Sequence, residues 1–302
     1  MQLTVDGKTV EAQKGQSLRE LVCGLGLDRE QLSQRPLAAR IAGEVFTLNY
    51  IPLRDKDGEG DRPSMRRAMA ASGGNIRLLR IRDSAGRDVY VRTGQFVVFL
   101  ALGQLWPEAV STMDCTLGSS VFISVTGAKD FSVSRLKAQV EQIVAQDIPL
   151  LRHRAKKEEA IARFAAEGQG DKARLLQWRS LEYCSEYSYG DYTDNFYGEM
   201  APSTGYLSVW DILPADGGFL FVYPDELEPD RPAKLSPMPQ FFSVFSEGER
   251  WCRLMDCENV ADLNELTASG KIRELIRVNE ALHEKRFSQV ADMVCSRGAK
   301  AV

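Results

Sequence analysis

The chain has 302 residues, of which 44% are hydrophobic and 26% are charged, and its formal net charge is -4 at pH 7. This length favours two or three domains, each with a core of its own. The mild acidity argues against a surface dominated by nucleic-acid binding, while leaving room for a local basic patch. We find no apolar run of about 18 residues and no N-terminal secretion signal, so we expect a cytoplasmic protein without membrane spans.

The residue types that bind metals are sparse. The six cysteines are scattered and form no C-x-x-C pair, so we expect reduced, mostly buried thiols. The chain has only two histidines, His153 and His283. This composition argues against a zinc site built on histidine.

Residues 1–54 have the pattern of a small α/β unit. Asp-Gly at residues 6–7 predicts a two-residue hairpin turn. The sequence Ser-Leu-Arg-Glu at 17–20 predicts a capping box at the start of a helix. Two further strands are predicted over 38–41 and 45–48. Hairpin, helix and further strands in this order are typical of a β-grasp domain.

A first domain boundary is predicted near residue 83. Residues 55–74 are charged and small, and we expect an exposed, mobile loop there. A strand over residues 76–81 then closes the first domain.

A second domain is predicted over residues 84–225. Its expected elements are a buried helix, a strand, an amphipathic helix starting at Val133, two short helices and an aromatic β-rich part, at residues 96–105, 121–125, 133–144, 158–166, 171–178 and 183–223. The predicted fold class is therefore α+β.

Residues 226–302 are predicted to form a proline-rich connector followed by helices. One helix is expected to end at Arg297-Gly298. The last residues resemble the start of a strand, so we expect that the chain is cut off before a further domain.

Specific segments carry a resemblance to known families. The first domain resembles the ubiquitin-like (TGS) domain of threonyl-tRNA synthetases. The second resembles the second additional domain of threonyl- and alanyl-tRNA synthetases, which clears mischarged tRNA. The matching segments are RTGQFVVFLALGQLWP, Leu136 to Ala160, Lys157 to Leu175 and YGDYTDNFYGEMAPSTG.

The arrangement of the whole chain resembles the front part of a bacterial nucleoside kinase of the uridine-kinase-like type. The segments that carry this likeness are GDYTDNFYGEMAPSTGYL and VADLNELTASGKIRELIRVNEALHEKRFSQVAD. The resemblance implies a P-loop kinase domain, in cis or in trans, and ATP and Mg²⁺ bound only by that domain. In this chain, Gly7-Lys8-Thr9 and Gly270-Lys271-Ile272 do not complete the G-x-x-x-x-G-K-[ST] motif.

Alignment with the synthetase editing family places its metal-site positions on residues of another kind. The H-x-x-x-H motif falls on Arg92 and Phe96, and the C-x-x-x-H motif falls on Phe196 and Met200. Zinc prefers imidazole, thiolate or carboxylate, which none of these side chains offers. We therefore expect a degenerate, metal-less site with no catalytic residue, no metal and no cofactor in this chain.

Two interpretations of this region stay open. Phe96, Phe196 and Met200 are either core residues that fill the old cavity or the wall of an apolar pocket for a base or ring. Asp194 either holds a turn or has a functional role. The candidate pocket residues are Arg92, His153, Tyr192, Asp194, Tyr197, Ser203 and Thr204.

A basic run and several tyrosines also leave a structural and a functional interpretation open. Residues 152–157, Arg-His-Arg-Ala-Lys-Lys, are either a solvated helix start or a contact for phosphate or an RNA backbone. The tyrosines at residues 183–197 either pack or stack on bases.

These features lead to two functional hypotheses. The main one is a non-catalytic regulatory or substrate-positioning region of an ATP-dependent nucleoside kinase. The alternative is a tRNA- or RNA-binding module of threonyl-tRNA synthetase descent without editing activity. A nucleoside or tRNA ligand and a homo-oligomer fit either hypothesis.

Overall fold

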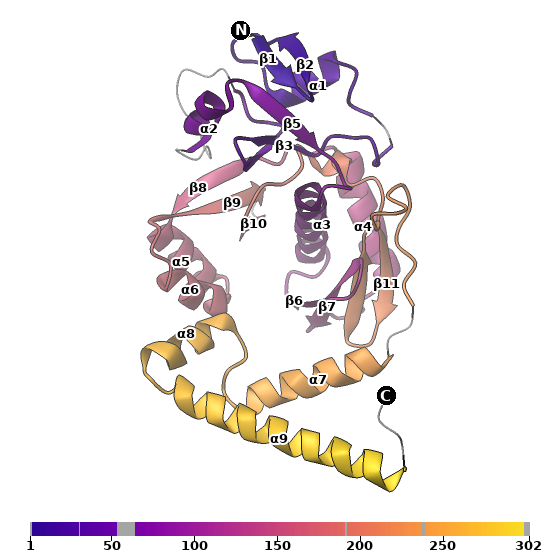
Figure 1. The fold of residues 1–302 in the computed structure, drawn as a ribbon, viewed down its shortest axis with the longest axis vertical. Helices are drawn as coiled ribbons and strands as arrows, with labels where there is room; N and C mark the ends of the chain where they lie inside the picture. Colours follow the sequence, from indigo (N-terminus) through magenta and orange to yellow (C-terminus); the bar gives the residue numbers. More distant parts are fainter. Residues whose placement is uncertain (1, 30, 53–63, 191, 237–238, 299–302) are drawn as a thin grey trace. The chain divides into compact units, whose positions relative to one another are not determined.

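The computed structural model describes residues 2–29, 31–52, 64–190, 192–236 and 239–298. Its contacts divide the chain into two compact units. The first comprises Met1–Ala155 with Cys184–Ser236, and the second comprises Lys156–Tyr183 with Pro237–Val302. The predicted α+β class is confirmed: a β-grasp-like sheet comes first, further α+β structure follows and long helices end the chain (Figure 1).

The first unit begins with a five-stranded sheet in the order β2-β1-β5-β3-β4. Its strands are β1 (Gln2–Val5), β2 (Lys8–Glu11), β3 (Ala38–Ile41), β4 (Glu44–Thr47) and β5 (Asn75–Leu79). Strand β1 runs parallel to β5, and the other pairs are antiparallel. Helix α1 (Leu18–Gly24) starts at the predicted capping box and buries Leu18, Leu21 and Val22.

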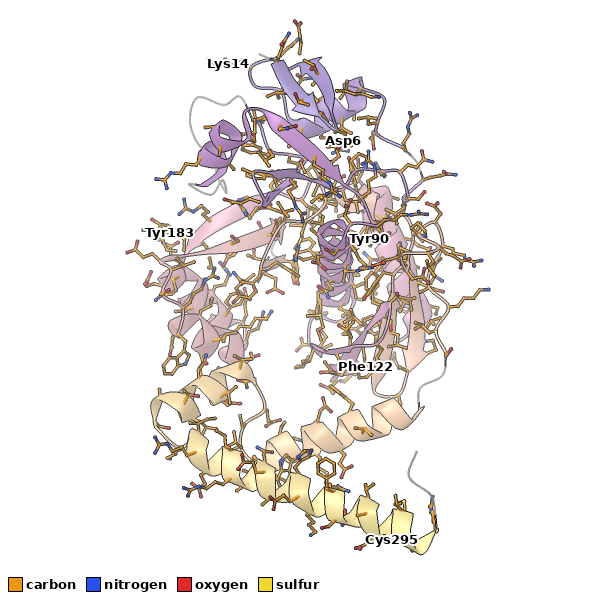
Figure 2. The ribbon with its side chains drawn as sticks, in the orientation of Figure 1. Asp6, Lys14, Tyr90, Phe122, Tyr183 and Cys295 are labelled. Carbon is orange, nitrogen blue, oxygen red and sulfur yellow. The ribbon has the colours of Figure 1, made fainter. Side chains whose placement is uncertain are left out.

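The rest of this unit is built around helix α3 (Ser84–Leu105), from which Tyr90 and its neighbours project (Figure 2). A four-stranded antiparallel sheet has the order β11-β12-β7-β6. Its strands are β6 (Val110–Thr116), β7 (Ser120–Thr126), β11 (Asp211–Ala215) and β12 (Gly218–Val222). The predicted amphipathic helix is α4 (Val133–Ala145), which packs against α3.

A three-stranded sheet, in the order β10-β9-β8, completes the part of the fold that positions the site. It consists of β8 (Arg152–Lys156), β9 (Tyr183–Tyr189) and β10 (Tyr192–Asn195). The short 3-10 helix η1 (Thr204–Tyr206) follows. The Asn49 side chain of the β-grasp part donates to the carbonyls of Leu150 and Pro202, at 3.2 and 2.9 Å, and so ties the two parts together.

The second unit is helical. It contains α5 (Lys157–Ala166), α6 (Gly170–Gln177), α7 (Pro239–Leu254), α8 (Val260–Ala268) and α9 (Ile272–Ser296). Arg174 of α6 lies 2.8 Å from the carboxylate of Asp262, the residue that completes the capping box of α8. Helix α9 ends at Arg297, as predicted, and none of its residues is buried.

Several expectations need correction. The loop expected over residues 55–74 is in part a helix, α2 (Ser64–Ser72), which buries Ala68 and Met69, while residues 55–63 lie outside the described part. Alanine, methionine and arginine favour helix, and no glycine interrupts this stretch. The basic run is for the most part a strand, β8, and only its end, at Lys156 and Lys157, starts a helix, α5.

The expectation of mostly buried thiols is also wrong. Cys184 is buried, whereas Cys23, Cys252 and Cys295 are exposed. Within the described residues, no helix is long and apolar enough to cross a membrane.

Candidate functional site

The four positions that align with the editing motifs come from two elements. Arg92 and Phe96 lie one turn apart on α3, so their side chains share a face of the helix. Phe196 and Met200 lie on the loop that follows β10. Phe96 and Met200 are buried, and Phe196 packs against the same core.

The space between α3 and the three-stranded sheet is filled by aromatic rings. The ring centroid of Phe96 lies 5.5 Å from that of Tyr192, 6.0 Å from that of Phe196 and 6.4 Å from that of Tyr187. The Tyr187 and Phe196 rings also meet edge to face, with centroids 6.4 Å apart. Aromatic pairs in such geometries each add about 0.5–1.5 kcal/mol to the gain from burial. We call Phe96, Tyr187, Tyr192 and Phe196 the aromatic cluster.

The hydroxyl of Tyr187 holds the loop against this cluster. It donates to the carbonyl of Gly198 at 3.2 Å and accepts from the backbone N–H of Met200 at 3.3 Å. Burial and the negative charge of Glu199 raise the pKa of Tyr187 well above its usual value. The side chain therefore remains protonated and serves as both donor and acceptor.

Arg92, the first of the four aligned positions, directs its charge at the loop backbone. Its guanidinium donates to the carbonyl of Glu199 at 2.5 Å. Burial lowers the pKa of Arg92. The guanidinium also packs on Gly198, where a Cβ would lie 2.9 Å from Cζ and where φ is +118°. This backbone angle favours glycine, and a side chain here would displace the guanidinium of Arg92.

The Glu199 side chain, next to the carbonyl that Arg92 binds, forms an ion pair with a second arginine, Arg152. Glu199 Oε1 lies 2.5 Å from Nη1 of Arg152 on β8, and the two side chains are 2% and 7% exposed. Burial makes such a pair costly to break, because removing one partner leaves the other charge buried. Arg152 therefore fixes the loop rather than offering its charge to a ligand.

The candidate pocket residues take part in separate sets of hydrogen bonds. Tyr192 donates to Asp194 at 3.3 Å, and Asp194 accepts from the backbone N–H of Asn195 at 2.7 Å. Tyr197 is 61% exposed, and His153 is half-buried on β8.

The two hydroxyl residues of that set lie elsewhere. Ser203 donates to Asp147, and Thr204 donates to the carbonyl of Ile143 at 2.9 Å. Thr204 also accepts from the N–H of Ile148, again at 2.9 Å. Both hydroxyls therefore fasten the start of η1 to the C-terminal end of α4 and the turn after it.

The side chains at the four aligned positions do not fit a metal ion. One guanidinium, two phenyl rings and a thioether provide none of the ligands that zinc prefers. Over the described residues, no three His, Cys, Asp or Glu side chains gather in a group able to hold a metal. The contacts of these side chains supply packing and fixed charges.

Three residues that matter here were not singled out from the sequence as site residues. Tyr187 and Glu199 fix the loop, and Thr93 of α3 accepts from the N–H of Ala201 at 2.9 Å. Thr93 also donates to the carbonyl of Val89 at 2.8 Å and is fully buried. The sequence signal is position: Thr93 follows one motif residue, and Glu199 precedes another.

Comparison with known proteins supports the synthetase part of the sequence resemblance. The chain is distantly similar to threonyl-tRNA synthetases. The threonine–tRNA ligase of Symbiobacterium thermophilum is 25% identical over 218 residues, which is 71% of this chain and 30% of the ligase. That of Methylococcus capsulatus is 26% identical over 192 residues, or 62% of this chain and 27% of the ligase. No family model matches the chain.

The extent of these matches limits what they imply. The chain corresponds to about 30% of the length of these ligases, so their full activity does not transfer to it. The synthetase part of the sequence resemblance is supported. The nucleoside-kinase part gains no support from these relatives.

Proposed function

We propose that this region binds RNA of the tRNA acceptor-end type without hydrolysing an aminoacyl ester. The observation that carries the proposal is the aromatic cluster, in which Phe96 and Phe196 stand at two of the positions aligned with the editing motifs, in a chain similar to threonine–tRNA ligases. A module of this descent that has lost its hydrolytic side chains retains binding as its remaining role.

The strand β8 and its surroundings support an RNA surface. Arg154 is exposed on β8, and Tyr189 and Tyr197 are 38% and 61% exposed. Exposed aromatic rings and exposed arginines suit RNA, because rings stack on bases and arginine contacts phosphates. Arg152 is excluded from this surface by its buried pair with Glu199.

Filter binding of bulk tRNA at 50 to 200 mM salt tests the proposal. We expect an affinity whose logarithm falls linearly with the logarithm of the salt concentration. Arg154→Ala should weaken binding and reduce the slope by about 0.9 or less, since one phosphate contact is lost. Arg273→Ala, at an exposed position on α9, is the matched control. Weak binding with no salt dependence would remove the RNA proposal.

A second candidate is the regulatory or substrate-positioning region of a nucleoside kinase. It is favoured by the kinase-like segments, which form the loop of the site and helices α8 and α9. An in-frame strand, G-x-x-x-x-G-K-[ST] motif and helix after Val302 would support it. A stop codon there, with no kinase gene nearby, would count against it.

A further inference from the structure

The β-grasp part has an open, shallow cavity of about 540 Å³ on the face of its sheet that carries Arg40 and Arg77. It lies between two hairpin turns, Asp6-Gly7 and Ala42-Gly43, in which all four residues have positive φ. Asp6 marks its place in Figure 2. Added Cβ atoms at Gly7 and Gly43 would meet nothing within 4 Å, so a ligand has room to approach the turn backbone.

Two arginines meet on this face. Arg40 of β3 lies directly opposite Arg77 of β5 in the antiparallel ladder, and both line the cavity. Like charges directly opposite each other destabilise a sheet. Asn75, on the same face of β5, also lines the cavity and offers an amide donor.

Among the described residues, the neighbouring acids neutralise Arg77 but not Arg40. Asp83 lies 2.6 Å from Arg77, and Asp6 is paired with Arg80 at 3.2 Å. Glu44 is the register partner of Ile41, so it belongs to the other face of the sheet.

One hydrogen-bond donor of Arg40 therefore lacks a partner among the described residues. Its Nε is buried and has no hydrogen-bond partner in the described part of the chain. A buried, unsatisfied donor on a charged group is costly, and an anion bound by the other N–H groups of the same guanidinium would offset that cost. Guanidinium presents its N–H groups in a planar fork that matches phosphate oxygens.

We propose that this cavity binds a phosphate group, held by Arg40 with support from Arg77 and Asn75. The volume of about 540 Å³ admits a phosphate together with part of its ester, such as a nucleotide. The source of the phosphate is either a small molecule or the backbone of an RNA. The inference rests on the charges of the β-grasp sheet and is independent of the aromatic cluster.

Thermal unfolding of the full chain tests the site. Sodium phosphate and uridine monophosphate are each compared with sodium chloride at equal ionic strength, for the natural protein, Arg40→Met and Arg82→Met. Arg82 is an exposed arginine outside the cavity lining. Because phosphate stabilises proteins in general, the readout is the difference between the variants.

We expect phosphate to raise the Tm of the natural protein and of Arg82→Met more than that of Arg40→Met. In chloride, Arg40→Met should be at least as stable as the natural protein, since the repulsion from Arg77 is gone. Titration calorimetry should show a loss of affinity for the phosphate compound of about 10-fold or more in Arg40→Met.

Competition with tRNA separates the sources. If the small phosphates have no effect but tRNA binding falls in Arg40→Met and not in Arg82→Met, the site takes a backbone phosphate. Equal responses of Arg40→Met and Arg82→Met to phosphate, uridine monophosphate and tRNA would overturn the proposal.

Discussion

Replacing Phe96 by alanine removes the centre of the aromatic cluster. Phe96 is fully buried, and its ring meets those of Tyr187, Tyr192 and Phe196. A buried Phe→Ala change costs about 3–5 kcal/mol, through lost burial and the cavity left behind. Three ring pairs at about 0.5–1.5 kcal/mol each place the expected loss in the upper part of that range. For a unit of this size, Tm should fall by roughly 6–20 °C.

Urea and thermal unfolding followed by circular dichroism measure this loss. Phe287→Ala is the matched control, because Phe287 is 63% exposed on α9. We expect the control to change the free energy of unfolding by about 0.5 kcal/mol or less. A loss below about 1 kcal/mol for Phe96→Ala would mean that the rings enclose an open, hydrated pocket. That result would refute the reasoning.

Three further predictions concern the buried contacts of Thr93 and Glu199 and the titration of the Asp262 carboxylate. Thr93→Val should cost about 1–3 kcal/mol in urea unfolding, because the N–H of Ala201 loses its acceptor, while Thr93→Ser should cost less. Glu199→Gln should cost about 3–5 kcal/mol in the same assay, since a buried guanidinium loses its carboxylate. Burial acts to raise the pKa of Asp262, but its hydrogen bonds with Arg174 and the cap backbone hold that pKa below its usual value. The stabilisation is therefore complete above the unfolded value of about 3.9 and is lost as pH falls through the lower folded pKa. A carboxyl NMR titration should show this, and Arg174→Ala should raise the titration midpoint.

Much of the fold could be predicted because local signals agree with the tertiary structure. The capping box at Ser17 starts α1, and Leu136, Val140 and Ile143 form the buried face of α4. The Asp6-Gly7 turn joins β1 to β2. In each case a short sequence pattern satisfies backbone groups or buries one face without needing a distant partner.

Elements whose identity depends on distant partners were missed. Strand β8 carries a basic sequence that also suits a helix start, and it becomes a strand because it pairs with β9. Strand β6 is polar and exposed over most of its length, and its pairing with β7 shifts between Met113 and Cys115. Neither strand has the apolar alternation that predicts a half-buried strand.

In the candidate site, too, local patterns predicted some features and missed those that depend on distant partners. Alignment of motifs located Phe96 and Met200, and the residue types themselves excluded metal ligation. The pair between Arg152 and Glu199 joins residues that are 47 positions apart, so no local pattern reveals it. The candidate pocket set also includes Thr204, whose hydroxyl donates to the carbonyl of Ile143 on α4, a contact that no local pattern reveals.

The central claim is that this region binds tRNA without hydrolysing its aminoacyl ester. The lifetime of that ester on bound tRNA tests the claim most directly. Mischarged tRNA of the threonine family is held with saturating protein, and released amino acid is measured beside bound tRNA in the same samples. The account predicts salt-sensitive binding and an ester that decays at the rate seen in buffer alone. Release faster than in buffer, lost on heat denaturation of the protein, would show that the aromatic cluster stands beside working hydrolytic groups and would contradict the account.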